Sequence, residues 1–432
     1  FLMRKMKKSR ALCVCLAALL LAGSGLLGVR QYRSPERSID VRNGQGQNLS
    51  FGMEKMAAAP APGGSDEAGD DGSGLAIAAK SAVLMDAGSG AVLFGQNEKK
   101  ELAPASVTKI MTMLLVLEAV DAGKISLEDS VTVSERAAGM GGSQMYMEPG
   151  EQHTMEELMK GIAMVSANDA CVAAAEHING SVEIFVEKMN QRAAELGMEN
   201  THFVNTNGLP ASNHYSSAYD IALMSRELLA HADGHSWFTT WQDTIKVGLP
   251  GKETEFGLTN TNKLIKQYPG AIGLKTGYTS DAGYCLSGAA KRENMTLIAV
   301  VMGCETSAVR LAEIKQLLDY GFANYDTVLL SRKGESVEKV FLPKGSPQEV
   351  DAVSPEEISV LIQKDKPASV TAEAILYPNP EPPLKKGDII GELRILKDGE
   401  EVAVKPLVSD RDVQKVGVKE MYQRVLRTLF EE

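Results

Sequence analysis

The spacing of hydrophobic positions changes several times along the chain, and each change marks a new element. Around a Gly-Ser-Gly turn at 88–90, the alternation of residues over 81–94 predicts a β-hairpin. Residues 110–120 are apolar on nearly every side of a helix that opens at Pro104, a residue favoured in the first helical turn. We expect a helix of this kind to lie buried in the middle of a domain.

Near the end of the same region, three apolar segments separated by short turns predict consecutive strands over 273–278, 283–291 and 295–304. A helical pattern over 307–322 follows them. Strands at both sequence ends with helices between them predict one antiparallel sheet, closed by the first and last strands, with helices packed on it. The expected fold class of residues 75–326 is therefore α+β.

After this region the pattern changes to short alternating segments between Gly, Pro and Asp turns, which predict a small all-β domain over 327–408. A Lys-Asp-Gly-Glu sequence at 397–400 is a good hairpin signal within it. The terminal segment, 409–432, is predicted to be an amphipathic helix whose charged side is mostly basic. This favours a helix on a membrane surface, and a helix docked on a domain or a partner is the alternative. Its apolar positions are Val418, Met421, Tyr422, Val425, Leu426 and Leu429.

The N-terminal region has a different character. Five cations precede an uncharged apolar stretch over 11–29, so residues 1–30 predict an export signal, either a cleaved signal peptide or a retained membrane anchor. Both alternatives stay open, because the stretch is long enough to span a bilayer. Residues 31–74 are small, polar and rich in Gly and Pro, which predicts a disordered linker.

Composition narrows the possible functions. Hydrophobic residues make up 44% of the chain, which allows a globular core, and a net charge of -11 without a basic stripe argues against nucleic-acid binding. None of the five cysteines has metal-ligand spacing with a histidine, so no metal or other cofactor is predicted. Cys171 is expected to pack in a helix, and Cys285 and Cys304 to lie on neighbouring strands without forming a disulfide.

Three short motifs carry the chemistry, and the first is Ser106-Val-Thr-Lys109. Its serine and lysine lie one helical turn apart on one face, and the serine is in the first turn, where exposed amides favour negative charge. A serine hydroxyl becomes nucleophilic when a neighbouring base accepts its proton. Lys109 can be that base if burial lowers its pKa. A lone Ser-x-x-Lys is frequent by chance, so the other motifs decide its meaning.

The second motif, Ser166-Ala-Asn168, falls between two predicted helices. Its serine can shuttle a proton from Lys109 to a leaving amine, and its asparagine can hold a peptide carbonyl of the substrate. The alternative is ordinary helix capping, for which both residue types are common.

The third motif, Lys275-Thr276-Gly277, lies on a predicted strand. Lys275 supplies positive charge, and Gly277 leaves room for a substrate backbone to lie alongside. The amides of Tyr278 and Ser106 can together form an oxyanion hole. A plain edge strand with a protective lysine is the alternative. The three motifs in this order favour an acyl-transfer enzyme over all the separate alternatives.

With these motifs the chain resembles the serine penicillin-recognising enzymes, and more narrowly the low-molecular-mass penicillin-binding proteins that are D-alanyl-D-alanine carboxypeptidases. The order of parts is also similar: export signal, catalytic domain, β domain and amphipathic tail. Longer stretches around the motifs carry the same likeness, and they are 103–112, 165–170, 202–209 and 273–279.

The resemblance implies a catalytic domain at 75–326 with the penicillin-binding/β-lactamase-like transpeptidase fold. It implies that a peptidoglycan stem peptide ending in D-Ala-D-Ala acylates Ser106, that the terminal D-Ala leaves and that water releases the shortened peptide. β-Lactam antibiotics are then covalent ligands, and the location is the outer face of the cytoplasmic membrane or the cell wall. Arg310, with Lys275 and Thr276 nearby, is implied to hold the terminal carboxylate.

Two positions depart from the family pattern. Ala167 stands where glycine is frequent, which should be tolerable, and Tyr278 stands where histidine often follows the third motif, which can alter deacylation or the pH response. Three other functions are weighed: a β-lactamase, a peptidoglycan DD-endopeptidase and a non-catalytic wall-binding relic. The absence of a convincing Glu-x-x-x-Asn after the second motif argues against the first, and the complete set of motifs argues against the last.

Overall fold

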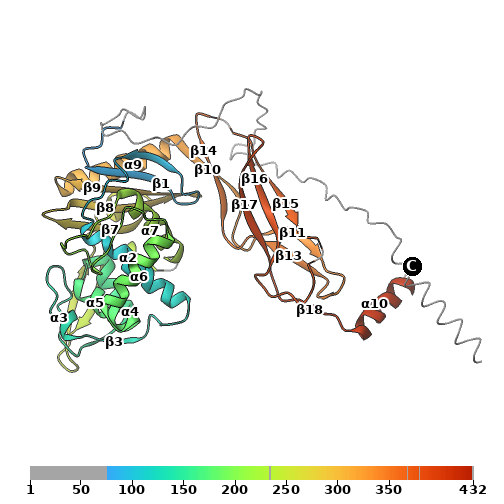
Figure 1. The fold of residues 1–432 in the computed structure, drawn as a ribbon, viewed down its shortest axis with the longest axis horizontal. Helices are drawn as coiled ribbons and strands as arrows, with labels where there is room; N and C mark the ends of the chain where they lie inside the picture. Colours follow the sequence, from blue (N-terminus) through green and yellow to red (C-terminus); the bar gives the residue numbers. More distant parts are fainter. Residues whose placement is uncertain (1–74, 233–234, 367, 379, 431–432) are drawn as a thin grey trace, which may run out of the picture.

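The computed structural model describes residues 75–430 except 233–234, 367 and 379 (Figure 1). The predicted signal or anchor at 1–30 and the predicted linker at 31–74 lie outside the described residues. Figure 1 shows two parts along the chain: helices around a sheet, which we call the sheet domain, and a second group of strands, which we call the β module. The sheet domain extends to the end of the long helix α9, and the β module follows it directly.

A five-stranded antiparallel sheet forms the centre of the sheet domain, in the order β2-β1-β9-β8-β7. Because β1 pairs with β9, the first and last parts of the domain meet in one sheet, which confirms the predicted closure. Strand β7, which carries the third motif, lies at an edge and pairs within this sheet with β8. The strands are β1 (Ser81–Asp86), β2 (Val92–Gln96), β7 (Ala271–Thr279), β8 (Gly283–Arg292) and β9 (Met295–Cys304).

Helices cover both faces of this sheet (Figure 1). Helix α9 (Ser307–Asn324) packs on one face, and α7 (Ala218–His231) packs on the other with α2 (Lys109–Asp121) behind it. Strand β9 explains the two layers, since successive side chains point to opposite faces. Its odd-numbered residues over 297–301 belong to the apolar cluster beneath α9, and its even-numbered residues over 298–302 belong to the larger cluster around α7 and α2.

Helix α2 is buried along most of its length, as its apolar sequence predicts. It contacts α5, α6 and α7 as well as the strand β7. The helix predicted to open at Pro104 begins instead with a short 3-10 turn, η1 (Ala105–Thr108), before the α-helical part starts. The remaining elements of the domain are β3 (Ser130–Thr132), α3 (Glu135–Ala138), β4 (Gln152–Thr154), α4 (Met155–Lys160), the π-helical turn η2 (Gly161–Val165), α5 (Asn168–Asn179), α6 (Val182–Glu195), η3 (Ser236–Phe238), β5 (Gln242–Val247), β6 (Thr254–Thr259) and α8 (Leu264–Gln267).

The β module contains a five-stranded antiparallel sheet in the order β11-β13-β17-β16-β15, with the pairs β10-β14 and β12-β18 beside it. Its separate apolar core includes Leu342, Ala352, Leu393 and Leu407. The strands are β10 (Tyr325–Ser331), β11 (Ser336–Phe341), β12 (Gly345–Ser346), β13 (Glu349–Val353), β14 (Ile358–Gln363), β15 (Val370–Leu376), β16 (Ile389–Lys397), β17 (Glu400–Ser409) and β18 (Gln414–Lys415).

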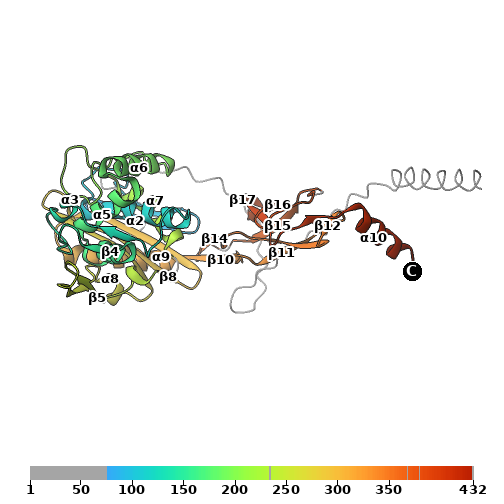
Figure 2. The ribbon, with the colours of Figure 1, turned by 90° about the horizontal axis from the view of Figure 1, so that it is seen from below.

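The last helix, α10 (Val418–Phe430), is shorter than the helix predicted over 409–432. The segment before it is extended, because β18 pairs with β12 and Val413 bridges to Leu384. Val413 is also fully buried in the core of the β module, so its neighbours cannot join a solvent-facing helix. Figure 2 shows α10 beyond the end of the β module that is remote from the sheet domain. None of the helices within the described residues is long and apolar enough to span a bilayer.

Candidate active site

Ser106 lies in the turn η1, immediately before the buried helix α2. This turn has an unusual backbone, since Ala105 has a φ of +47°, a region that residues other than glycine rarely adopt. The loop after α6 packs against it at Gly208, where a Cβ atom would overlap the carbonyl oxygen of Ala105. Glycine is therefore required at 208, and the fitted turn and loop leave Ser106 partly exposed.

The amine of Lys109 meets the hydroxyl of Ser106, with 2.8 Å between Nζ and Oγ. Lys109 is fully buried, and burial lowers its pKa from 10.5 to about 8, although nearby Cys171 and Asp169 oppose the shift. At pH 7 about a tenth of the molecules therefore hold a neutral amine, which can accept a proton. The spacing read from the sequence thus brings a buried base to the hydroxyl.

A second contact of Lys109 was not anticipated from the sequence. Its Nζ donates to the backbone carbonyl of Asn207 at 2.7 Å, from a loop 98 positions further along the chain. The side chain of Asn207 in turn accepts the backbone N–H of Leu209, which holds the loop in shape. The only signal was the likeness of 202–209 to the family, and periodicity gives no sign of such a long-range carbonyl contact.

Ser166 and Asn168 stand at the junction between the π-helical turn η2 and α5. Ser166 has a φ of +64°, and its buried hydroxyl has no partner within the described part of the chain. The amide nitrogen of Asn168 donates to the carbonyl of Gly141 at 2.7 Å, while its Oδ1 atom is buried and unpaired there as well. Buried polar atoms normally find partners, so these two atoms are suited to receive a substrate. Neither residue hydrogen-bonds to Ser106 or Lys109.

The edge strand β7 lies directly against the Ser106 turn. A Cβ atom on Gly277 would come within 3.0 Å of the carbonyl oxygen of Pro104 and 3.1 Å of the amide nitrogen of Ser106. From the sequence alone, Gly277 is explained by the room that it leaves for a substrate backbone. The structure adds that the turn around Ser106 also needs this room, because a side chain at 277 would crowd it. Thr276 is almost buried, and its hydroxyl shares a hydrogen bond of 2.8 Å with that of Thr261.

Lys275 on the same strand is fully buried and donates to the carbonyl of Thr276 at 3.0 Å. Burial, assisted by the charges of Lys109 and Arg310, holds the pKa of Lys275 well below its usual range. Lys275 therefore lies within the electrostatic reach of two other basic side chains, and within the described residues neither Lys275 nor Arg310 forms an ion pair with a carboxylate. A site of this kind favours an anionic ligand.

Arg310, in the first turn of α9, reaches backbone carbonyls of β7 and β8. Its Nη1 atom lies 3.4 Å from the carbonyl of Gly277 and 3.3 Å from that of Cys285, and its Nε atom is buried without a partner among the described residues. Its guanidinium also lies over the ring of Tyr284, 5.6 Å from the centroid. Burial lowers the pKa of this guanidinium, and it stays charged at neutral pH.

Two tyrosines extend this arrangement toward the surface. Tyr278 pairs with Tyr284 across β7 and β8, and their ring centroids are 4.3 Å apart. The Tyr278 side chain is 55% exposed, so its ring is available beside the site while its backbone amide stays on the strand. Tyr284 was missed in the sequence, because a tyrosine on a strand carries no signal by itself.

The three described cysteines are buried and unpaired, as the sequence predicts. Burial raises the pKa of the Cys171 thiol to about 12, so it is a neutral packing residue beside the two site lysines. Cys304 lies on β9 opposite Tyr284, one residue from Cys285, and its thiol donates to a carboxylate oxygen of Glu313.

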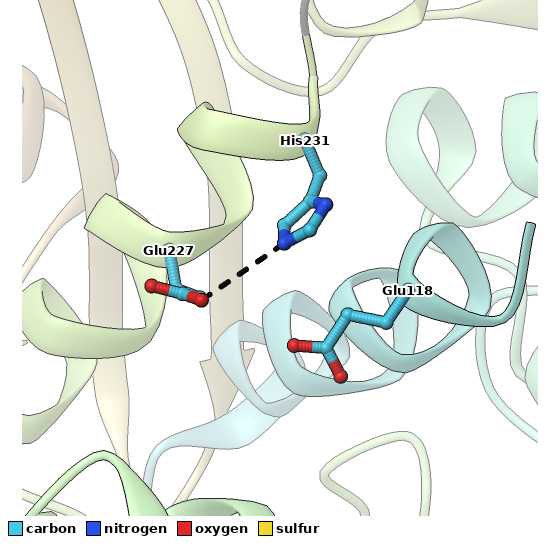
Figure 3. A group of neighbouring side chains, drawn as sticks. All are labelled: Glu118, Glu227 and His231. Atoms are coloured by element: carbon cyan, nitrogen blue, oxygen red, sulfur yellow. Dashed lines mark ion pairs between the residues drawn. The ribbon is translucent and has the colours of Figure 1, made fainter. Parts of the chain in front are cut away.

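One group of side chains has the composition of a metal site: Glu118, Glu227 and His231, at the ends of α2 and α7 (Figure 3). Figure 3 shows the His231 ring directed at Glu227 on its own helix, with 3.9 Å between Nε2 and Oε1. Arg192 donates to Glu118 at 2.8 Å and to Glu227 at 2.6 Å, so a cation of the chain already neutralises these carboxylates. The group is therefore an ion-pair network that joins α2, α6 and α7.

Comparison with known proteins gives two family matches. A family described as D-alanyl-D-alanine carboxypeptidase matches residues 67–306, and one described as penicillin-binding protein 5, C-terminal domain, matches 325–415. The chain is 45% identical over 353 residues to D-alanyl-D-alanine carboxypeptidase DacF of Bacillus subtilis, covering 82% of this chain and 90% of the relative. It is 34% identical to DacC of Escherichia coli, covering 79% and 86%.

Solved structures agree with the fold. Penicillin-binding protein 5 from Haemophilus influenzae is similar with a TM-score of 0.61 and 35% identity, covering 79% of this chain and 99% of that one. Penicillin-binding protein 6B from Escherichia coli is similar with a TM-score of 0.59 and 30% identity, covering 83% and 100%. Both likenesses cover more than three quarters of this chain, and they confirm the predicted α+β fold followed by an all-β domain.

Proposed function

The chain belongs to the D-alanyl-D-alanine carboxypeptidase family, and from this premise we propose how the residues around Ser106 carry out the reaction. The activity is removal of the terminal D-Ala from peptidoglycan stem peptides by a serine hydrolase that also binds penicillin. One observation carries the assignment of residues: the fully buried amine of Lys109 lies 2.8 Å from the hydroxyl of Ser106.

In the acylation step, Ser106 Oγ attacks the carbonyl carbon of the penultimate D-Ala as neutral Lys109 takes the hydroxyl proton. The oxyanion accepts hydrogen bonds from the backbone N–H groups of Ser106 and Tyr278, and the close approach of Gly277 to the Ser106 amide supports this pairing. The C–N bond then breaks and the terminal D-Ala departs. The rest of the stem peptide stays bound to Ser106 as an ester. Water hydrolyses that ester in the second step.

The second motif serves the leaving group and the substrate backbone. The unpaired hydroxyl of Ser166 passes the proton from Lys109 to the departing amine. The unpaired Oδ1 atom of Asn168 accepts a hydrogen bond from a peptide N–H of the stem peptide, while its Nδ2 stays on Gly141. The sequence-based role for Asn168, in which the amide holds a substrate carbonyl, uses the second N–H of Nδ2, because the bond to Gly141 occupies only one of the two.

The basic groups on and next to β7 select the substrate. The terminal carboxylate binds Arg310, whose buried Nε is unpaired, with the charge of Lys275 and the hydroxyl of Thr276 beside it. This preference for a free carboxylate separates carboxypeptidase from DD-endopeptidase action, since a cross-link places a longer chain at that position. No observation within the described residues favours the endopeptidase, the β-lactamase or the wall-binding relic.

Two substrates test this function directly. A synthetic stem pentapeptide ending in D-Ala-D-Ala should lose one D-Ala, and a cross-linked muropeptide dimer should stay intact, as followed by mass spectrometry of the products. Cleavage of the dimer without release of D-Ala from the pentapeptide would establish an endopeptidase instead. Rapid turnover of penicillin without a lasting adduct would establish a β-lactamase.

Arg310→Gln should weaken recognition of the free carboxylate. A hydrogen bond to a charged group contributes about 1.5–3 kcal/mol, so kcat/KM for the pentapeptide should fall about 10- to 100-fold, mainly through KM. A pentapeptide with a C-terminal amide should be cleaved equally by the variant and the parent protein. Arg136→Gln, which removes only an exposed ion pair with Glu183, is the matched control. An equal loss on acid and amide would remove Arg310 from this role.

For the location, we propose an exported enzyme on the outer face of the cytoplasmic membrane, attached by α10. On this helix Val418 is 89% exposed and Tyr422 is 65% exposed, and their spacing of four residues places them on one face. Lys419 lies beside them in the sequence, and an apolar face flanked by basic residues suits an anionic membrane surface. The export signal proposed for residues 1–30, cleaved or retained, delivers the chain to this side.

Removal of residues 417–432 should abolish binding to vesicles that contain anionic lipid. Release of D-Ala from a soluble pentapeptide should be unchanged, because α10 lies at the remote end of the β module (Figure 2). Flotation of both proteins with the vesicles measures the difference. Double substitution of Val418 and Tyr422 by serine is the gentler variant and should also lose most of the vesicle binding. Vesicle binding that is unchanged by removal of 417–432 would contradict attachment by α10.

A further inference from the structure

A chain of buried hydrogen bonds runs from His214 to the peptide group that precedes Ser106. The backbone N–H of Val204 donates to His214 Nδ1 at 3.0 Å. On the other side of the ring, Nε2 lies 2.8 Å from the hydroxyl of Thr108, and this hydroxyl lies 2.8 Å from the carbonyl oxygen of Ala105. Thr108 is fully buried and His214 is only 6% exposed.

The donor and the acceptor of each hydrogen bond in this series follow from the first bond, between Val204 and His214. Because His214 Nδ1 accepts a hydrogen bond from the backbone N–H of Val204, the neutral ring carries its own proton on Nε2. Nε2 then donates to Thr108, and the single hydroxyl proton of Thr108 remains for Ala105. The ring stays neutral, since burial, assisted by the charge of His202, lowers the pKa of His214 to about 4. The His214 ring, the Thr108 hydroxyl and the Ala105 carbonyl each have a hydrogen-bond partner in this arrangement.

The last acceptor matters because of its place in the backbone. The carbonyl of Ala105 and the N–H of Ser106 belong to one peptide group, and a hydrogen bond to the carbonyl makes the N–H of the same group a stronger donor. The same bond also fixes Ala105 at its φ of +47°, which aims that peptide group. Gly208 packs closely against this carbonyl from the loop after α6, so contacts from both Thr108 and Gly208 hold the peptide group in place.

We propose that Thr108 and His214 are positioning residues, which hold and polarise the Ser106 amide so that it receives the oxyanion formed during acylation. Neither touches the substrate. The inference rests on the proposed function, in which Ser106 is the nucleophile and its own N–H is one of the two oxyanion donors. A purely structural role for the two residues would lower stability without changing the electronic state of the acyl group.

The test is the infrared carbonyl band of the penicilloyl-enzyme, formed with penicillin labelled with ¹³C at the β-lactam carbonyl. Weaker donation by the Ser106 amide shifts this band to higher wavenumber. We expect Thr108→Val to show that shift and to acylate about tenfold more slowly, a fraction of the effect of deleting an oxyanion donor. Thr108→Ser, which keeps the hydroxyl, should restore the band and most of the rate.

His214→Phe should move the band in the same direction, and the double variant should lose little more than Thr108→Val alone, because the two residues act in series. The matched control is His153→Phe. His153 is also buried, at 4% exposure, and its ring bonds to Glu151 instead. This control should lower the free energy of unfolding but leave the band and the acylation rate unchanged.

An unshifted band in Thr108→Val or in His214→Phe overturns the inference, even if the variant is less stable or slower. The carbonyl band of either variant is sufficient for this test. If one variant does not fold, the band of the other still decides. Intact-mass analysis of the parent protein comes first. If penicillin leaves no adduct on Ser106 there, the proposed function fails; if the adduct forms and the band does not move in the variants, only the positioning role fails.

Discussion

Ser106→Ala will abolish both covalent labelling by penicillin and release of D-Ala, with the fold intact. The hydroxyl of Ser106 is the proposed nucleophile, and within the described residues it receives one hydrogen bond, from Lys109. Its loss should change the free energy of unfolding by no more than about 1 kcal/mol. Intact-mass analysis after penicillin and product analysis with the pentapeptide measure the two activities on the same sample, and urea unfolding measures stability.

The control for this variant is Ser126→Ala, at an exposed position in the loop before β3. It should label and turn over like the parent protein. Continued release of D-Ala by Ser106→Ala would refute the assignment of the nucleophile, whatever the labelling shows. Loss of activity together with loss of the cooperative unfolding transition would instead show a damaged fold.

Lys109→Met should reduce acylation by about 10³-fold, the usual contribution of a general base. Methionine keeps the length and much of the shape of the side chain in a fully buried position, but it cannot accept a proton. Noncovalent binding of the pentapeptide should survive, because we propose that the groups around Arg310 hold its carboxylate. Labelling by penicillin at the parental rate would remove Lys109 from the role of base.

The parent protein should show the titration of the same amine. Since the base must be neutral and its pKa is about 8, the acylation rate should rise about tenfold per pH unit below 8 and level off above it. The stability of the protein should change with pH in the same direction. The Lys109 amine keeps its proton up to pH 10.5 in the unfolded chain but only up to about pH 8 in the folded one, so its contribution to the free energy of unfolding rises between pH 8 and 10.5. Lys109→Met should lack both pH dependences, and a profile that is flat through pH 8 in the parent protein contradicts the assignment.

Local patterns in the sequence were enough for most of the fold. The strands predicted over 283–291 and 295–304 match the bounds of β8 and β9 to within one residue, because clear turns separate these apolar segments. The apolar run after Pro104 predicted the buried helix α2, since no exposed helix can carry apolar residues on every side. The spacing of Ser106 and Lys109 placed their side chains together for a similar reason, because the geometry of a helical turn is local.

The features that sequence analysis missed all depend on contacts between distant segments. The 3-10 turn and the positive φ of Ala105 exist because Gly208 and β7 press on that turn from two sides. Asn207 and Tyr284 act through a backbone carbonyl and a ring face, which no residue pattern announces. The helix predicted from 409 starts later, because Val413 is used by the core of the β module.

The elongated arrangement in Figure 2 has a consequence for where the enzyme works in the wall. If α10 rests on the lipid surface, the β module is a spacer that fixes how far above the bilayer the Ser106 turn is carried. The stem peptides within that height are then accessible, and those in older, outer layers of the glycan are not. A longer or shorter spacer of the same construction would trim a different layer with unchanged chemistry.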